Sequence, residues 1–136
     1  MNDGIRSHAG ESMTDRRIRI VRLYADQAGE SHFSDEQLET AAADFVPPAP
    51  AIYVSAPAEA KRSLFLLLPD GWYGDLHPAP SRQLMVMVTG ILEVMASDGE
   101  VRRFKSGDAV LVEDIFGKGH ATKSIDGKSI VAVVQR

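Results

Sequence analysis

The sequence predicts one all-β domain, a sandwich or a barrel, and three observations lead to that fold class. Short β-prone runs are separated by turn residues at intervals of about 8–12 residues, a spacing typical of sandwiches and barrels. The pairs Asp70-Gly71, Asp98-Gly99 and Asp126-Gly127 are strong turn signals, because both residue types tolerate positive φ. All 7 prolines lie between Pro47 and Pro80, where they exclude long helices.

The expected strands are the β-prone runs between these turns. The first begins with the alternation Arg-Ile-Arg-Ile, which suits a strand with one buried face. Asp98-Gly99 is expected to close a hairpin between the runs on either side of it. The expected strands are Arg17–Tyr24, Ala51–Ser55, Ser63–Leu68, Leu84–Val88, Ile91–Ala96, Val101–Phe104, Ala109–Val112, His120–Ile125 and Ser129–Gln135.

Residues 34–45 are the exception to the strand pattern. Ser34 and Gln37 are spaced as a capping box, and apolar residues follow at helical spacing. Taken alone, the segment predicts a short helix. The Pro47–Pro50 cluster that follows is expected to be a rigid connector rather than a linker between domains.

Composition limits the classes of function. The chain of 136 residues has 15 Lys and Arg against 19 Asp and Glu, a net charge of −4. An acidic domain without a basic run is not expected to bind nucleic acid. The sequence contains no cysteine, which excludes disulfides, thiolate metal sites and a cysteine nucleophile. The apolar run Leu64–Leu68 is far too short to span a membrane, so no membrane partner is expected.

The first residues contain little that can pack. Residues 1–15 are therefore expected to form a flexible N-terminal tail, and residues 16–136 the folded domain. His8 lies in that tail and is assigned no role. No apolar secretory segment follows the start, so a cytoplasmic location is expected.

A motif of defined spacing runs from Gly71 to Gly90. Five residues separate Gly71 from His77, Ala79 comes two positions later, three residues lead to Gln83, and six more lead to Gly90. This pattern resembles the first motif of the cupin superfamily, which reads Gly, five residues, His-x-His, three or four residues, Glu, six residues, Gly.

A second motif begins at Gly107. Five residues separate it from Glu113, and the segment then reaches Gly117-Lys118-Gly119-His120. It resembles the second cupin motif, which reads Gly, five residues, Pro-x-Gly, two residues, His, three residues, Asn. Here two residues are inserted, Glu113 replaces the Pro, and Ser124 stands in place of the Asn.

The resemblance covers residues 16–136 and implies an all-β, antiparallel cupin barrel of the jelly-roll type with an N-terminal arm. In that fold residues 34–45 are extended chain rather than a helix. The stand-alone cupins that this chain resembles commonly dimerise through their N-terminal strands. A homodimer is therefore expected, supported by the alternating Arg17–Tyr24 strand.

The resemblance also defines a candidate metal site. In metal-binding cupins, two histidines and a glutamate of the first motif join one histidine of the second to hold Fe, Mn, Ni, Zn or Cu. Carried over, His77 and His120 are ligands, Ala79 replaces the second histidine, and Gln83 replaces the glutamate. Two imidazoles and a neutral amide supply too few ligands and too little charge for a divalent ion. No tightly bound cofactor is expected, and any site for Zn, Ni, Fe or Mn would be weak.

Carboxylates and aromatic residues near the motifs are further candidates. Asp75, Glu113 and Asp114 are the carboxylates that a metal site could recruit. Trp72 and Tyr73 either wall a ligand pocket or pack over one end of the core.

Two further basic side chains have local interpretations. Arg82 is adjacent to Gln83 on a strand, so its side chain is expected to face away from the barrel interior. His32 is expected to be exposed or locally hydrogen-bonded, the alternative being a position at the barrel mouth or at a partner subunit.

Two functions remain open at this point. The first is a single-domain cupin that binds a small organic molecule, such as an acid, through His77, Gln83 and His120. The second is a metal-dependent enzyme, a dioxygenase or isomerase, acting on a small metabolite with the same residues as ligands. Ala79 and Gln83 stand in place of a histidine and a glutamate, which favours the binding of an organic molecule. Because His77 and His120 are retained, the metal-dependent enzyme stays open.

Overall fold

The computed structural model describes residues 15–136, and within that range the chain is all-β. Residues 1–14 of the predicted tail, His8 among them, lie outside this range. The described residues form no helix that is long and apolar enough to cross a membrane. The strands are β1 (Ile18–Ala25), β2 (Ser31–Leu38), β3 (Thr40–Ala43), β4 (Ile52–Ser55), β5 (Arg62–Leu68), β6 (Tyr73–His77), β7 (Gln83–Thr89), β8 (Leu92–Ala96), β9 (Val101–Phe104), β10 (Ala109–Val112), β11 (His120–Ser124) and β12 (Ser129–Gln135).

The helix that residues 34–45 predict by themselves is wrong, and the extended chain is confirmed. These residues belong to β2 and β3. In β2, Ser31 and Phe33 are buried while the residues between and after them are not, which is the two-residue period of a strand. A short helix is marginal without tertiary packing, so pairing of β2 with β1 outweighs the local capping signal.

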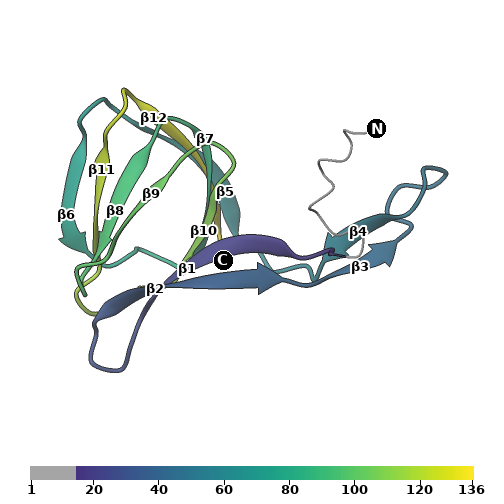
Figure 1. The fold of residues 1–136 in the computed structure, drawn as a ribbon, viewed down its shortest axis with the longest axis horizontal. Coiled ribbons are helices and arrows are strands. Elements are labelled where there is room, and N and C mark those ends of the chain that lie inside the picture. The colour runs from purple at the N-terminus through teal and green to yellow at the C-terminus, as the bar shows by residue number, and fades with distance from the viewer. Residues whose placement is uncertain (1–14) are drawn as a thin grey trace. The chain divides into compact units, whose positions relative to one another are not determined.

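Packing divides the chain into two units. The larger unit consists of residues 20–36 and 58–136. It contains a six-stranded sheet in the order β2-β1-β10-β7-β12-β5 and a four-stranded sheet in the order β6-β11-β8-β9. Figure 1 shows these sheets curving around a common interior, with β6, β11, β8 and β9 on one side and β10, β7, β12 and β5 on the other. This arrangement is the predicted jelly-roll barrel.

The smaller unit contains the antiparallel pair β3 and β4, in which Thr40 lies opposite Ser55. The guanidinium of Arg16 lies 4.3 Å from the ring centroid of Tyr53. Arg16 also accepts a hydrogen bond from the Thr40 hydroxyl through its carbonyl oxygen. Large apolar side chains of this unit are exposed, among them Phe45, Val46, Ile52 and Tyr53.

The hairpin predicted at Asp98-Gly99 is confirmed. β8 and β9 pair antiparallel, with Leu92 opposite Phe104. The turn is closed by the Gly99 amide, which donates to the Ala96 carbonyl, and by the Ala96 amide, which donates to the Glu100 carbonyl.

One pairing in the larger sheet is parallel. β1 runs parallel to β10, with Val21 opposite Val110 and Leu23 opposite Val112. The amide of Glu113 then donates to the Leu23 carbonyl at 2.7 Å, which extends the pairing past the end of β10. The first strand therefore fixes the direction in which the chain leaves β10, towards the residues that precede His120.

The core lies between the two sheets of the larger unit. Along β8 and β12 buried residues alternate with half-buried ones, as expected for strands with one face inside. Leu23, Val131 and Val133 are essentially inaccessible to solvent. They belong to an apolar cluster with members from both sheets, including Val94 and Phe104.

The turn between β7 and β8 provides a test of the packing. Gly90 has a φ of +84°, and a Cβ there would lie 2.5–2.7 Å from Ser129 and the Lys128 carbonyl. Gly99 has a similar φ of +96° but nothing within 4 Å. Gly99→Ala is expected to cost about 1–2 kcal/mol of stability from backbone strain alone. Gly90→Ala is expected to cost clearly more, because the same strain is joined by a clash with backbone. Urea unfolding of both variants measures the difference, and equal losses would contradict this packing.

Candidate functional site

The barrel of the larger unit encloses a cavity of about 490 Å³. Its wall is mainly aliphatic, and a few polar side chains interrupt it. The lining residues are Leu23, Leu64, Leu66, Leu67, Leu68, Trp72, His77, Ala79, Pro80, Gln83, Met85, Met87, Leu92, Val94, Phe104, Val110, Val112, His120, Thr122, Val131, Val133 and Gln135. A cavity of this size and lining is typical of a site for a small organic molecule.

The two motif histidines lie side by side in the wall of this cavity, where His120 is half-buried and His77 is exposed. His77 ends β6 and His120 begins β11, and the two residues are opposite each other in the antiparallel pairing of these strands. Their ring centroids are 5.4 Å apart, with 41° between the ring planes. Sequence positions 43 residues apart (120 − 77) thus supply one pair of imidazoles.

The imidazole of His77 is oriented by its own strand. Its Nδ1 lies 2.7 Å from the backbone carbonyl oxygen of Asp75. A carbonyl oxygen only accepts, so Nδ1 carries the proton and donates it. The other ring nitrogen, Nε2, is left for the cavity.

The imidazole of His120 is oriented by a buried carboxylate. Its Nδ1 lies 2.6 Å from Oδ2 of Asp114, whose side chain has no solvent exposure. The other carboxylate oxygen, Oδ1, is buried and has no hydrogen-bond partner among the described residues. The backbone carbonyl of Asp114 accepts from the Ala79 amide at 2.9 Å, which fastens the loop before β11 to the segment after β6. His120 therefore also keeps Nε2 as the ring nitrogen that is left for a ligand.

Gln83 is the third motif residue in the cavity wall, and it is 8% exposed. Its Oε1 accepts a hydrogen bond from Nε2 of Gln135 at 3.2 Å. Oε1 of Gln135 in turn accepts from Nε of Arg62 at 2.7 Å. The amide nitrogen of Gln83 contacts only the sulfur of Met85, at 3.9 Å. Gln83 thus offers the cavity an N–H donor, while its oxygen is already engaged.

The structure brings some predicted residues together and leaves others outside. His77, Gln83 and His120 line one cavity, and Trp72 contributes to its wall. Tyr73, the first residue of β6, does not line the cavity and is 57% exposed. Whether the lining residues bind a ligand stays a prediction.

The carboxylates considered for recruitment have other partners. Asp75 is exposed, and its Oδ1 accepts from the Leu76 amide and the Tyr73 hydroxyl. Glu113 accepts hydrogen bonds from the guanidinium groups of Arg22 and Arg82. Burial by itself would raise the pKa of Glu113, but the two arginines outweigh it and hold the pKa below its usual value. Neither Asp75 nor Glu113 lines the cavity, and Arg82 faces away from it, as predicted.

Sequence reasoning missed three contributors to the site. Gln135 and Thr122 line the cavity, and Arg62 orients Gln135. No local motif marks these residues, since only the pairing of β12 with β7 sets Gln135 opposite Gln83. Asp114 was considered only as a metal ligand, whereas it orients His120.

A glycine allows the two histidine strands to approach each other. Gly119 has a φ of +76°, and a Cβ there would lie 2.0 Å from the backbone carbon and oxygen of His77. Its own carbonyl accepts a hydrogen bond from the Ser31 hydroxyl at 2.7 Å. The residue before His120 is thus held between β6 and the start of β2.

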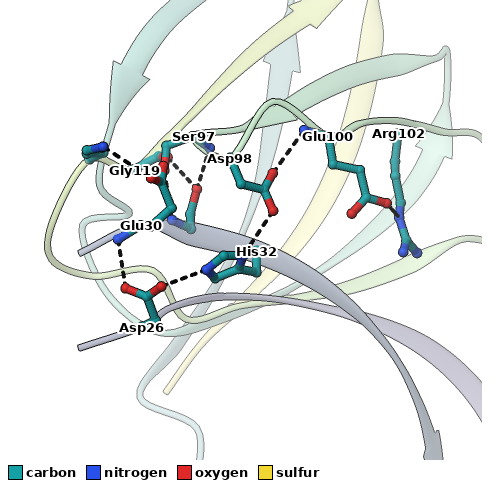
Figure 2. Close-up of polar contacts among 10 residues, drawn as sticks. Asp26, Glu30, His32, Ser97, Asp98, Glu100, Arg102 and Gly119 are labelled. Carbon is teal, nitrogen blue, oxygen red and sulfur yellow. Dashed lines mark hydrogen bonds and ion pairs between the residues drawn. The ribbon is translucent and has the colours of Figure 1, made fainter. Parts of the chain in front are cut away.

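The turn between β1 and β2 contacts the same loop, because the Gly29 carbonyl accepts a hydrogen bond from the Lys118 amide at 2.9 Å. Figure 2 shows His32 between two carboxylates, Asp26 at 2.7 Å from Nε2 and Asp98 at 2.9 Å from Nδ1. The local hydrogen-bonding predicted for His32 is confirmed. Hydrogen bonds to Asp26 and Asp98 raise the pKa of His32 above its usual value, and the bond to His32 lowers the pKa of Asp26.

Cupin metal sites use four side chains, and the residues here do not fit that requirement. Among residues 15–136 no group of three or more His, Cys, Asp or Glu side chains is arranged to hold a metal ion. His77 and His120 are suited to be ligands, since each has its Nδ1 anchored as metal-binding histidines do. The cavity wall adds only Gln83, whose oxygen is bonded to Gln135, and Ala79, which has no donor.

The similarity of this chain to known proteins is limited to solved structures of low sequence identity. No protein-family model matches the chain, and no curated protein sequence matches it. Among solved structures, the chain is similar to the conserved SPY1581 protein of unknown function from Streptococcus pyogenes, with 18% identity, a TM-score of 0.45, and coverage of 60% of this chain and 69% of that one. It is also similar to protein NMB1881 from Neisseria meningitidis, with 21% identity, a TM-score of 0.42, and coverage of 57% and 81%.

The Cnp3 cupin domain of Schizosaccharomyces pombe covers more of the chain. It is 13% identical with a TM-score of 0.44, and the alignment spans 88% of this chain and 86% of that domain. Because every one of these TM-scores is below 0.5, the likenesses carry no argument about function. The two curved sheets of the larger unit are an all-β barrel, the fold class that the sequence predicts.

The hydrogen bonds of His32 with Asp26 and Asp98 predict that the stability of the protein depends on pH. A raised pKa means that the folded state binds the proton more tightly than the unfolded state. The stabilisation is therefore fully present at pH values below the pKa of His32 in the unfolded state. It is lost as pH rises through the pKa of His32 in the folded state. Thermal unfolding of the wild type and of His32→Gln between about pH 5.5 and about pH 9 tests this. The wild type is expected to be more stable than His32→Gln by an amount that shrinks as pH rises. A difference that grows with pH would contradict the stabilising role of these hydrogen bonds.

A gain-of-function substitution tests the reason given for the poor metal site. Ala79 and Gln83 line the same cavity as the histidines, so Ala79→His together with Gln83→Glu restores both missing ligands. This double variant is expected to bind one equivalent of Zn²⁺ or Ni²⁺ in calorimetric titration, and the wild type well under one. Each single variant serves as a control. Stoichiometric metal in wild-type protein after dialysis against chelator would contradict the account.

Proposed function

We propose that this protein binds a small organic molecule inside the barrel. The observation that carries the proposal is the convergence of His77, Gln83 and His120 in one cavity whose remaining wall is mostly aliphatic. An apolar wall stabilises the body of a ligand by removing apolar surface from water, at about 25 cal/mol per Å². A few polar groups at fixed positions then select its orientation.

The anchoring of the imidazoles supports a binding role. A buried carboxylate paired with an imidazole is costly to desolvate, and an apolar pair of similar size would serve the fold as well or better. Asp114 nevertheless lies fully buried against His120. Preorganised polar groups of this kind lower the entropy cost of binding.

A metal-dependent enzyme of the dioxygenase or isomerase type is the second candidate. One observation favours it, namely that Nδ1 of His77 and of His120 is bonded to oxygen, which leaves both Nε2 atoms for an ion. The shortage of further donors in the cavity wall weighs against it, and no reaction step is assigned.

A homodimer remains part of the proposal. The β3–β4 pair exposes Phe45, Val46, Ile52 and Tyr53, and an isolated two-stranded sheet is at best marginally stable in water. Contact with a second subunit would cover this apolar surface.

Blocking the cavity tests the proposed binding. Thr122 is half-buried in the cavity wall, so Thr122→Phe is expected to fill part of the space, whereas Thr122→Val keeps the size of the side chain. The neutral fluorescent dye Prodan is expected to bind saturably, with a blue-shifted emission, to the wild type and to Thr122→Val. Thr122→Phe is expected to lower its affinity about tenfold or more. Equal dye binding by both variants, each with an intact thermal transition, would contradict the proposal.

A further inference from the structure

We propose that the cavity selects an aliphatic molecule with a primary carboxamide head, an inference that rests on the proposed function. The hydrogen-bond donors and acceptors in the wall decide which head group the cavity favours. In a largely apolar cavity, a buried polar group left without a partner costs about 1–3 kcal/mol.

Two acceptors lie next to each other in the wall. Nδ1 of His77 donates to the Asp75 carbonyl, and Nδ1 of His120 is bonded to the Asp114 carboxylate. Both histidines line the cavity and have Nδ1 engaged, so Nε2 is the ring nitrogen that each has left for a ligand. An imidazole whose single N–H proton is on Nδ1 carries a lone pair on Nε2.

The two rings are close enough for one group to bond to both. Their centroids are 5.4 Å apart, and a single nitrogen with two N–H bonds makes hydrogen bonds of about 2.9 Å in two directions. An NH₂ group between the rings of His77 and His120 therefore satisfies both acceptors.

One donor stands beside these acceptors. The oxygen of Gln83 already accepts one hydrogen bond from Gln135, whereas its two N–H groups have no strong acceptor among the described residues. The sulfur of Met85, at 3.9 Å, is a weak acceptor and leaves their bonding capacity largely unused. A carbonyl oxygen of the ligand can accept a hydrogen bond from the Gln83 amide. Its second lone pair can accept another from the Thr122 hydroxyl or the Trp72 indole N–H, which are both in the wall.

The charge of the wall favours a neutral head. Among the lining side chains of the described residues there is no Lys, Arg, Asp or Glu. The nearest buried charge is the carboxylate of Asp114 behind His120, which repels an anionic head. Arg22 and Arg82 lie outside the cavity and are paired with Glu113. A charged head would lose its hydration without a charged side chain in the wall to pair with.

A primary carboxamide is the neutral head that matches this set. It has two N–H donors for the two imidazoles and one carbonyl acceptor for Gln83. An alcohol has one donor, and a tertiary amide has none. The aliphatic residues of the wall, such as Leu66, Val94 and Val131, accommodate an alkyl body.

Calorimetric titration with four compounds of one chain length tests the inference. The compounds are hexanamide, N,N-dimethylhexanamide, 1-hexanol and hexanoate. Hexanamide is expected to bind about tenfold more tightly than the dimethyl amide or the alcohol, because one or two hydrogen bonds are lost in each. Hexanoate is expected to bind more weakly than hexanamide.

Three variants connect the preference to the named residues. His77→Leu and Gln83→Leu each remove one partner and are expected to lower hexanamide affinity about fivefold. Lys123 lies on the strand of His120 and is exposed. Lys123→Gln is therefore expected to leave the affinity for hexanamide unchanged. Thermal unfolding confirms that each variant is folded.

The remaining outcomes distinguish a failure of the carboxamide inference from a failure of the proposed function. Equal affinity for the four compounds, a preference for hexanoate, or Prodan binding without hexanamide binding would overturn the carboxamide inference and leave the proposed function standing. Failure of the wild type to bind either Prodan or any of the four compounds would overturn the proposed function itself.

Discussion

The hydrogen bond between Asp114 and His120 is the interaction on which the site depends. It forms because the parallel pairing of β1 with β10 directs the chain past Glu113, and because the Asp114 carbonyl accepts from the amide of Ala79. Asp114 is fully buried, and removing one partner of a buried pair typically costs about 3–5 kcal/mol. The bond also fixes which nitrogen of His120 faces the cavity.

The sequence predicted the elements of the barrel better than their pairing. β-prone runs and Asp-Gly turns locate strands such as β8 and β9, since a hairpin is a local structure. The parallel pairing of β1 with β10 joins distant residues and has no local signal. Likewise, motif spacing predicted that His77, Gln83 and His120 would meet. The motif spacing does not predict Gln135. This residue lies beside Gln83 because of the register between β12 and β7.

The cavity has two oriented imidazoles but lacks the further ligands that a metal site needs. Both imidazoles are still oriented through Nδ1, whereas Ala79 and Gln83 stand at the other two ligand positions. The oxygen of Gln83, the one atom there with some ability to ligate, is bonded to Gln135. The proposed binding of an organic molecule would use the two imidazoles, the amide of Gln83 and the aliphatic wall.

The most direct measurement is the long-range ¹H–¹⁵N NMR spectrum of the histidine side chains, with His77 and His120 assigned by substitution. The account predicts a proton on Nδ1 of both rings, since each Nδ1 is bonded to an oxygen that only accepts. Asp114→Asn should disturb the signals of His120 far more than those of His32. A spectrum in which Nε2 carries the only proton of either ring would contradict the arrangement from which the binding site is derived.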